Sequence, residues 1–130
     1  MARNQGFLQV VLEHRFFGKS QPESDWSTEH LNLWTGEQVI ADAALFIRAL
    51  QAELDAKYGF SPTRTYAIAG GSFGGNLVAW FNLKFPHLIQ AAIADTAPVM
   101  AIEEFWIMDD FVGRILAQHP PCLEMTQYAI

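Results

Sequence analysis

The chain has 130 residues and a formal net charge of −6, with 51% apolar and 17% charged residues. This length suits a single domain. An acidic chain without clustered Lys and Arg is a poor candidate for binding nucleic acid or an anionic membrane. The apolar fraction is high for a small soluble domain, so the chain needs an extensive core or a partner surface. No apolar run approaches the about 18 residues of a membrane-spanning helix.

The sequence gives no sign of a disulfide, a metal site or a secretion signal. Cys122 is the only cysteine, so it can form neither an internal disulfide nor a Cys-based metal site. The four histidines show no regular ligand spacing. The apolar residues 7–12 are too few for the core of a signal peptide.

Residues 7–12, Phe-Leu-Gln-Val-Val-Leu, are typical of a buried strand in a parallel sheet. The polar residues 13–20 follow the carboxyl end of this strand, which is the edge where ligands bind in open α/β sheets. Glu13 and Arg15 are therefore candidates for a site edge. We favour a plainer role for both, a structural ion pair that anchors the loop. The long connection over residues 21–34 is of a kind that often carries function in α/β enzymes.

The next element is an amphipathic helix with a capping box. Thr35 caps its first turn, Gln38 reaches back, and Gly59 ends it. One face carries apolar residues at helical spacing, which indicates packing against a core. These residues are Val39, Ala43, Phe46, Ile47, Leu50 and Leu54.

Residues 70–74, Gly-Gly-Ser-Phe-Gly, fit the pattern Gly-x-Ser-x-Gly, the nucleophile elbow of α/β-hydrolases. Ser72 would sit on a strained turn, and Gly70 and Gly74 would let neighbouring backbone pass close to it. The alternative is a glycine-rich turn with an incidental serine. An apolar strand over residues 64–69 and a helical pattern after Ser72 favour the elbow.

The remaining elements complete a β-α-β-α-β-α order, typical of a doubly wound α/β fold with about three parallel strands and flanking helices. The helix behind the elbow is apolar nearly all round, which predicts burial, and it ends at Pro86. A third strand is expected over residues 88–94. It ends at Asp95, a second candidate for the site edge and otherwise a helix cap or turn acceptor. Residues 99–130 mix helical spacing with a break at residues 119–122.

Two blocks of sequence resemble one family. Residues 13–22 are similar to the "EHR-aromatic-aromatic-G-K/E-S-x-P" block of the lysosomal Pro-X carboxypeptidase and dipeptidyl peptidase II family of serine peptidases. Residues 70–75, with 79–81 and 84–87, look like its "GGSYGG…AAWFRxKYPH" block. Shorter similarities, to "LTSEQALAD" and "AASAP", extend the resemblance over residues 7–98. They are carried by Leu33, Thr35, Glu37, Gln38, Ala41, Asp42, Ala94, Ala97 and Pro98.

The resemblance implies a partial α/β-hydrolase catalytic domain over residues 1–130, with the start of a helical insertion at 99–130. It implies that Ser72 is the nucleophile and that the backbone N–H of Phe73 helps to form the oxyanion hole. The elbow glycines would be Gly70, Gly71, Gly74 and Gly75. Family members cleave peptides next to proline as carboxypeptidases or dipeptidyl peptidases. They need no cofactor, are often dimers, and are lysosomal, vesicular or secreted.

The chain also departs from the family pattern. The family's catalytic Asp and His lie far downstream and have no counterpart in this sequence, and Cys122 lacks the partner of a similar family cysteine. The order Ser72, Asp95, His119 matches that of an α/β-hydrolase triad, but nothing in the sequence aims His119 at Ser72. We therefore expect a fragment or a truncated gene product of a serine exopeptidase. An esterase or lipase of the same fold and an inactive pseudo-peptidase are the alternatives.

Overall fold

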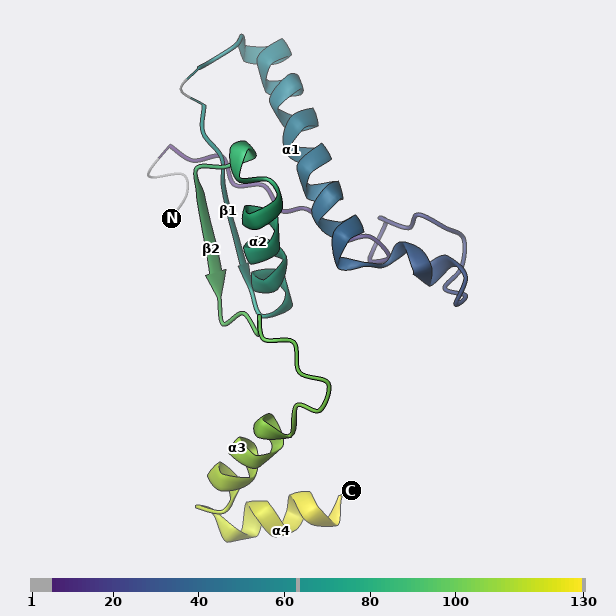
Figure 1. The fold of residues 1–130 in the computed structure, drawn as a ribbon, viewed down its shortest axis with the longest axis vertical. Coiled ribbons are helices and arrows are strands. Elements are labelled where there is room, and N and C mark those ends of the chain that lie inside the picture. Colours follow the sequence, from purple (N-terminus) through teal and green to yellow (C-terminus); the bar gives the residue numbers. More distant parts are fainter. Residues whose placement is uncertain (1–5, 63, 130) are drawn as a thin grey trace. The chain divides into compact units, whose positions relative to one another are not determined.

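The computed structural model describes residues 6–62 and 64–129, which divide into two compact units between Val99 and Met100. The first unit begins with an irregular segment and a short 3-10 helix, His30–Leu33. The long helix α1, Gly36–Tyr58, follows, and then strand β1, Ala67–Gly71, helix α2, Phe73–Lys84, and strand β2, Ala91–Asp95 (Figure 1). The second unit holds helices α3, Trp106–Leu116, and α4, Pro120–Tyr128.

Helix α1 begins and ends where the sequence predicts. The Thr35 side chain accepts a hydrogen bond from the Gln38 backbone N–H, with 3.2 Å between the two atoms. Gly59 follows the last turn at φ 81°, and its N–H donates to the Asp55 carbonyl. A glycine adopts this backbone conformation without the steric cost of a Cβ atom. Local capping chemistry therefore sets both ends of α1.

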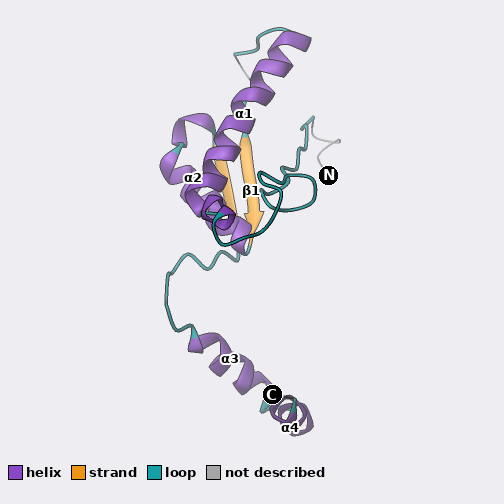
Figure 2. Cartoon of the chain, turned by 90° about the vertical axis from the view of Figure 1, so that its right-hand side faces the viewer, coloured by secondary structure: helices purple, strands orange, loops and turns teal. Residues whose placement is uncertain are grey.

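Strands β1 and β2 are parallel and hydrogen-bonded, in a register that runs from Ala67 opposite Ala91 to Gly71 opposite Asp95. Helix α2 connects them and covers one face of this pair (Figure 1, Figure 2). The core lies between α1, α2 and the segment that leads into β2. Its buried members are Ile40, Ala44, Ile47, Phe81 and Ile89.

The described residues form two strands where we expected about three. Residues 7–12 form no strand, and the Val11 side chain is 84% exposed. A strand owes its stability to pairing and to packing on neighbours, and none of the described residues pairs with this segment. The apolar run alone does not show whether a neighbouring strand is available for pairing. The other strands begin later than predicted, and β1 extends through Gly71.

Burial of α2 on all sides was also a wrong prediction. The helix buries one face, made of Gly75, Asn76, Val78 and Phe81. On its other side Leu83 is 78% exposed. Among the described residues the helix packs mainly on α1 and the two strands, with further contacts to the short 3-10 helix Pro86–Leu88 that follows it.

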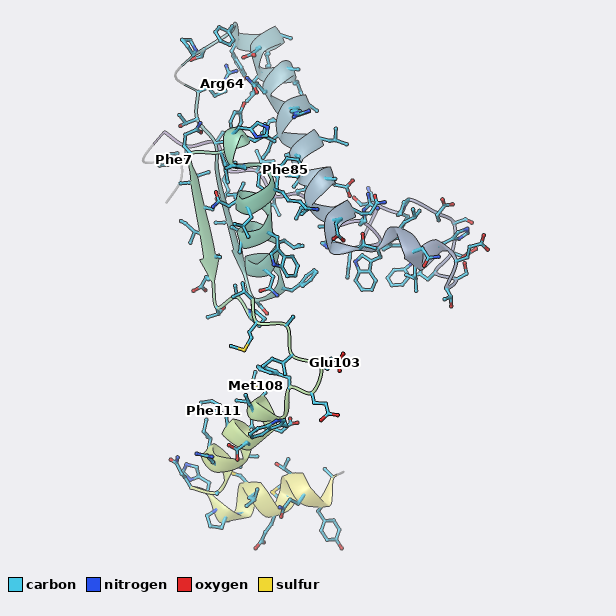
Figure 3. All side chains as sticks on the ribbon, viewed as in Figure 1. Phe7, Arg64, Phe85, Glu103, Met108 and Phe111 are labelled. Carbon is cyan, nitrogen blue, oxygen red and sulfur yellow. The ribbon has the colours of Figure 1, made fainter. Side chains whose placement is uncertain are left out.

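The second unit has no buried residue in either helix. Side chains such as Met108 and Phe111 project from α3 (Figure 3) and are more than half exposed. The break expected at residues 119–122 separates α3 from α4, but Pro120 also begins α4, since proline is tolerated in a first helical turn. In the described parts of both units, every helix is too short or too polar to cross a membrane.

Candidate active site

Ser72 occupies the turn between β1 and α2 in a strained backbone conformation. Its φ and ψ are 54° and −125°, a region that side-chain-bearing residues rarely adopt. Strain of this kind costs on the order of 1–3 kcal/mol and persists only where the surroundings enforce it. Two backbone hydrogen bonds hold Ser72 in this conformation. The Ser72 N–H donates to the Asp95 carbonyl at 3.0 Å, and the Ser72 carbonyl accepts from the Asn76 N–H at 3.2 Å.

Two glycines make this close turn sterically possible. A Cβ atom on Gly70 would overlap the Gly74 carbonyl. A Cβ atom on Gly75 would lie 2.8 Å from the Ala97 Cβ and 2.9 Å from the Asp95 carbonyl oxygen. We expected Gly70 and Gly74 to carry this role. A Cβ atom on Gly74 would meet nothing within 4 Å, so the second required glycine is Gly75.

The first turn of α2 lies directly behind Ser72. Phe73 is its first residue, and the N–H groups of a first helical turn lack intrahelical acceptors. The positive end of the helix dipole adds to their electrostatic effect. The turn can therefore stabilise negative charge that develops close to Ser72, which is the chemistry of an oxyanion hole.

Asp95 meets the elbow at the carboxyl end of β2. It lies opposite Gly71 in the register, and its backbone carbonyl accepts the Ser72 N–H. Its carboxylate lies beside β1, since a Cβ atom built on Gly71 would be 4.0 Å from the Asp95 Oδ2. The structure thus brings Asp95 to the elbow, where its backbone helps to fix the turn.

Glu13 organises the loop over residues 13–20. Its Oε2 accepts hydrogen bonds from the backbone N–H groups of Lys19 and Ser20, each at 2.9 Å. Hydrogen bonding by Ser20, chiefly through its side chain, and by the Lys19 N–H lowers the pKa of Glu13. A Cβ atom on Gly18, which has φ 50°, would overlap the Glu13 carboxylate. Glu13 therefore stabilises its own loop by accepting hydrogen bonds from the loop backbone.

Arg15 joins this loop to α1. Its Nε and Nη2 donate to the two carboxylate oxygens of Asp42 at 2.6 and 2.7 Å, and its Nη1 donates to the Leu33 carbonyl. The hydrogen bonds to Asp42 raise the pKa of Arg15. Arg15 thus forms an ion pair that anchors the loop, with Asp42 as its partner and not Glu13. Sequence reasoning missed this role of Asp42, although Asp42 belongs to the block that resembles "LTSEQALAD".

Sequence reasoning also missed a cluster of aromatic rings beside the elbow. The His14 ring contacts the rings of Phe17, Trp34 and Phe73. The available signal was the density of aromatic residues between positions 14 and 34, together with the phenylalanine directly after Ser72.

His119 and Cys122 both lie in the second unit. His119 precedes the first turn of α4, and Cys122 is an exposed free thiol in that helix. Across residues 6–62 and 64–129, no three His, Cys, Asp or Glu side chains are placed to hold a metal ion.

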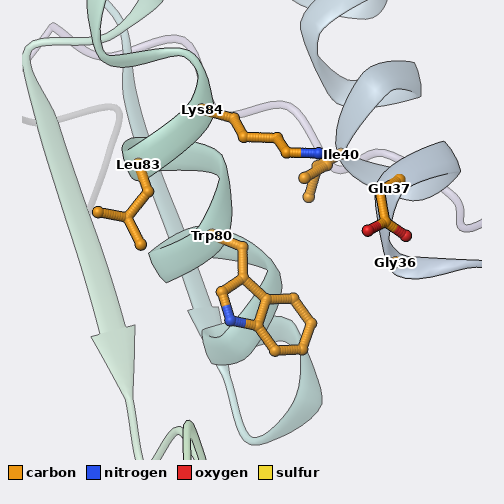
Figure 4. A pocket seen from close by; sticks show the side chains of 6 residues that line it. All are labelled: Gly36, Glu37, Ile40, Trp80, Leu83 and Lys84. Carbon is orange, nitrogen blue, oxygen red and sulfur yellow. The ribbon is translucent and has the colours of Figure 1, made fainter.

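A groove lies between the start of α1 and the end of α2 (Figure 4). Ile40, Trp80 and Leu83 give it apolar walls, and Glu37 and Lys84 add opposite charges. It contains none of the candidate site residues, so it is separate from the elbow.

A serine held on a strained turn between a parallel strand and a helix is the arrangement by which serine hydrolases of the α/β class are recognised. The model of the family described as serine carboxypeptidase S28 matches residues 1–130. The chain therefore belongs to the S28 family of serine carboxypeptidases.

Individual relatives cover most of the chain. Prolyl carboxy peptidase like protein 5 of Caenorhabditis elegans is 41% identical over 83% of the chain and 22% of its own length. Human lysosomal Pro-X carboxypeptidase is 40% identical over 75% of the chain and 19% of its own length. The thymus-specific serine protease of the mouse is 36% identical over 87% of the chain and 21% of its own length. The chain thus spans about a fifth of the length of these curated relatives.

Proposed function

We propose that this chain is the nucleophile-bearing segment of a serine exopeptidase that cleaves peptides next to proline. The observation that carries the proposal is the backbone of Ser72, which is strained, fixed by Asp95 and Asn76, and followed by the first turn of α2. Family membership and the name of the Pro-X carboxypeptidase relatives support the substrate class.

In the proposed reaction the Ser72 Oγ bonds to the carbonyl carbon of the substrate while a general base takes the hydroxyl proton. The backbone N–H of Phe73 donates to the oxyanion, a contribution of about 2.7–4 kcal/mol in comparable sites. The amine leaves with the proton, and water then hydrolyses the acyl-enzyme. The triad Asp and His belong to a longer catalytic domain, of which residues 99–130 begin the helical insertion. Asp95 lies at the edge of this site, whereas Glu13 and Arg15, the other candidates for the site edge, hold the loop of residues 13–20 in place.

The names of the relatives also bear on where the protein acts. By analogy with relatives that are named lysosomal, we place the full-length protein in a lysosomal, vesicular or secreted compartment. From the resemblance to the family we also propose that it forms a homodimer and needs no cofactor. Its partners would then be proline-containing peptides.

The proposal is tested by the substrate range of the product of the complete open reading frame. We expect cleavage of proline-containing peptides. Ser72→Ala should lower kcat by at least about 10³-fold, because the variant has lost its nucleophile. The rate that remains would come from the oxyanion hole and from substrate binding. Ser24→Ala, in the exposed connection before α1, is the matched control and should keep full activity. Hydrolysis of short acyl esters without peptide cleavage would favour an esterase of the same fold. A function that survives Ser72→Ala would favour an inactive pseudo-peptidase.

A further inference from the structure

Thr96 follows strand β2 and lies beside the candidate nucleophile. The register pairs Gly71, the last residue of β1, with Asp95, the last residue of β2. Ser72 and Thr96 are therefore the next residues on two parallel strands, which end at the same edge of the sheet (Figure 1). Neighbouring strands are about 4.8 Å apart, so the chain leaves the sheet at Thr96 next to the turn that carries Ser72.

Thr96 has a strained backbone conformation. Its φ is 45°, and the other described non-glycine residues with a positive φ are Phe16, at 67°, and Ser72, at 54°. A β-branched residue is a marked outlier in this region, because its Cβ atom is crowded by the backbone. Burial of the whole Phe16 side chain offsets the strain at that residue, whereas Thr96 is exposed. Packing of its own side chain therefore does not explain why Thr96 keeps this conformation.

The two neighbours of Thr96 supply the explanation, because both contact the elbow. The Asp95 carbonyl accepts the Ser72 N–H at 3.0 Å. The Ala97 side chain lies against Gly75, where an added Cβ atom would be 2.8 Å from the Ala97 Cβ. These contacts hold the chain on both sides of Thr96 and so enforce its positive φ. Residues that are held in strained conformations cluster at active sites, where the strain contributes to preorganisation.

We propose that Thr96 is a positioning residue for Ser72. Its left-handed conformation turns the chain so that the Asp95 carbonyl and the Ala97 side chain both contact the elbow. The proposal rests on the proposed function, since it concerns the placement of the nucleophile. A glycine at position 96 would free the backbone, and the elbow would spend less time in the reactive geometry. This matters because a misplacement of about 1 Å can lower a rate about 10²-fold.

The test replaces Thr96 in the product of the complete open reading frame. It measures the rate constant for fluorophosphonate labelling of Ser72 and the urea midpoint of unfolding. Thr96→Gly should lower the labelling rate about three- to tenfold, less than a displacement of the serine by a full ångström would. The urea midpoint should stay the same or rise, because glycine adopts a positive φ without strain. A merely structural role would not separate the two measurements in this way.

Two further variants complete the test. Asparagine tolerates a positive φ better than most residues with a side chain, so Thr96→Asn should label within about twofold of the wild-type rate. Thr28→Gly is the matched control, because Thr28 is exposed in the connection before α1 and is not among the residues with a positive φ. It should leave the labelling rate unchanged.

The outcomes separate this proposal from the proposed function. An unchanged labelling rate in Thr96→Gly would overturn the positioning role and leave the proposed function standing. A urea midpoint of Thr96→Gly below that of Thr28→Gly, or failure of Thr96→Gly to fold, would make Thr96 a stabilising residue and also overturn it. Equal losses of labelling in Thr96→Asn and Thr96→Gly would do the same, because the threonine side chain would then be the cause. A folded wild-type protein without labelling at Ser72 would overturn the proposed function and this proposal with it.

Discussion

At the scale of single residues, the elbow depends on atoms that approach too closely for side chains. Gly70 passes the carbonyl of Gly74, and Gly75 passes both Ala97 and the Asp95 carbonyl. The pattern Gly-x-Ser-x-Gly names positions 70 and 74, whereas the contacts single out 70 and 75. The difference arises because the contacts of Gly75 come from Asp95, at the end of β2, and from Ala97, which follows that strand, and both are distant in sequence from the motif.

We expect Gly75→Ala to lower the free energy of unfolding by about 1–3 kcal/mol, since the new methyl group overpacks a turn fixed by backbone. Gly74→Ala is the matched control. It adds a methyl group in open space within a helix, where alanine is favoured over glycine by up to about 1 kcal/mol. Urea denaturation of both variants of the full-length protein measures the difference. Equal destabilisation by the two substitutions would contradict this account of the elbow.

At the scale of elements, the sequence predicts structure well where the signals are local. Thr35 and Gly59 delimit α1 through their own capping interactions, and the strand, glycine and helix pattern around Ser72 is also local. Residues 7–12 show the limit, because strand formation requires a partner that an apolar run does not specify. The Arg15 partner and the aromatic cluster were missed for the same reason, since both join residues that are distant in sequence.

The ion pair between Arg15 and Asp42 connects the first loop to α1 and should be sensitive to side-chain shape. Lysine keeps the charge but cannot form two parallel hydrogen bonds to one carboxylate. We expect Arg15→Lys to lower the free energy of unfolding by about 1 kcal/mol, a modest figure because Asp42 is partly exposed. Arg48→Lys, at an exposed position of α1, should change it by less than about 0.5 kcal/mol. Urea denaturation measures the free energy of unfolding of both variants. Equal changes in the two variants would contradict the anchoring role of Arg15.

At the scale of the whole molecule, the apolar composition predicts an extensive core or a partner surface. The described core is small, and large apolar side chains stay exposed on both units. They include Phe7, Leu83, Ile93, Trp106 and Phe111. This surface suits a segment that packs within the longer catalytic domain that we propose. From family membership and the elbow we expect Ser72 to be the chemical centre of the molecule.

Active-site labelling tests that centre most directly. The product of the complete open reading frame is treated with a fluorophosphonate, and the modified residue is identified by peptide mass spectrometry. Our account predicts one labelled peptide, modified at Ser72, and no labelling of the Ser72→Ala variant. Folded protein with an unmodified Ser72, or labelling of another serine that persists in Ser72→Ala, would contradict the assignment of Ser72 as the nucleophile.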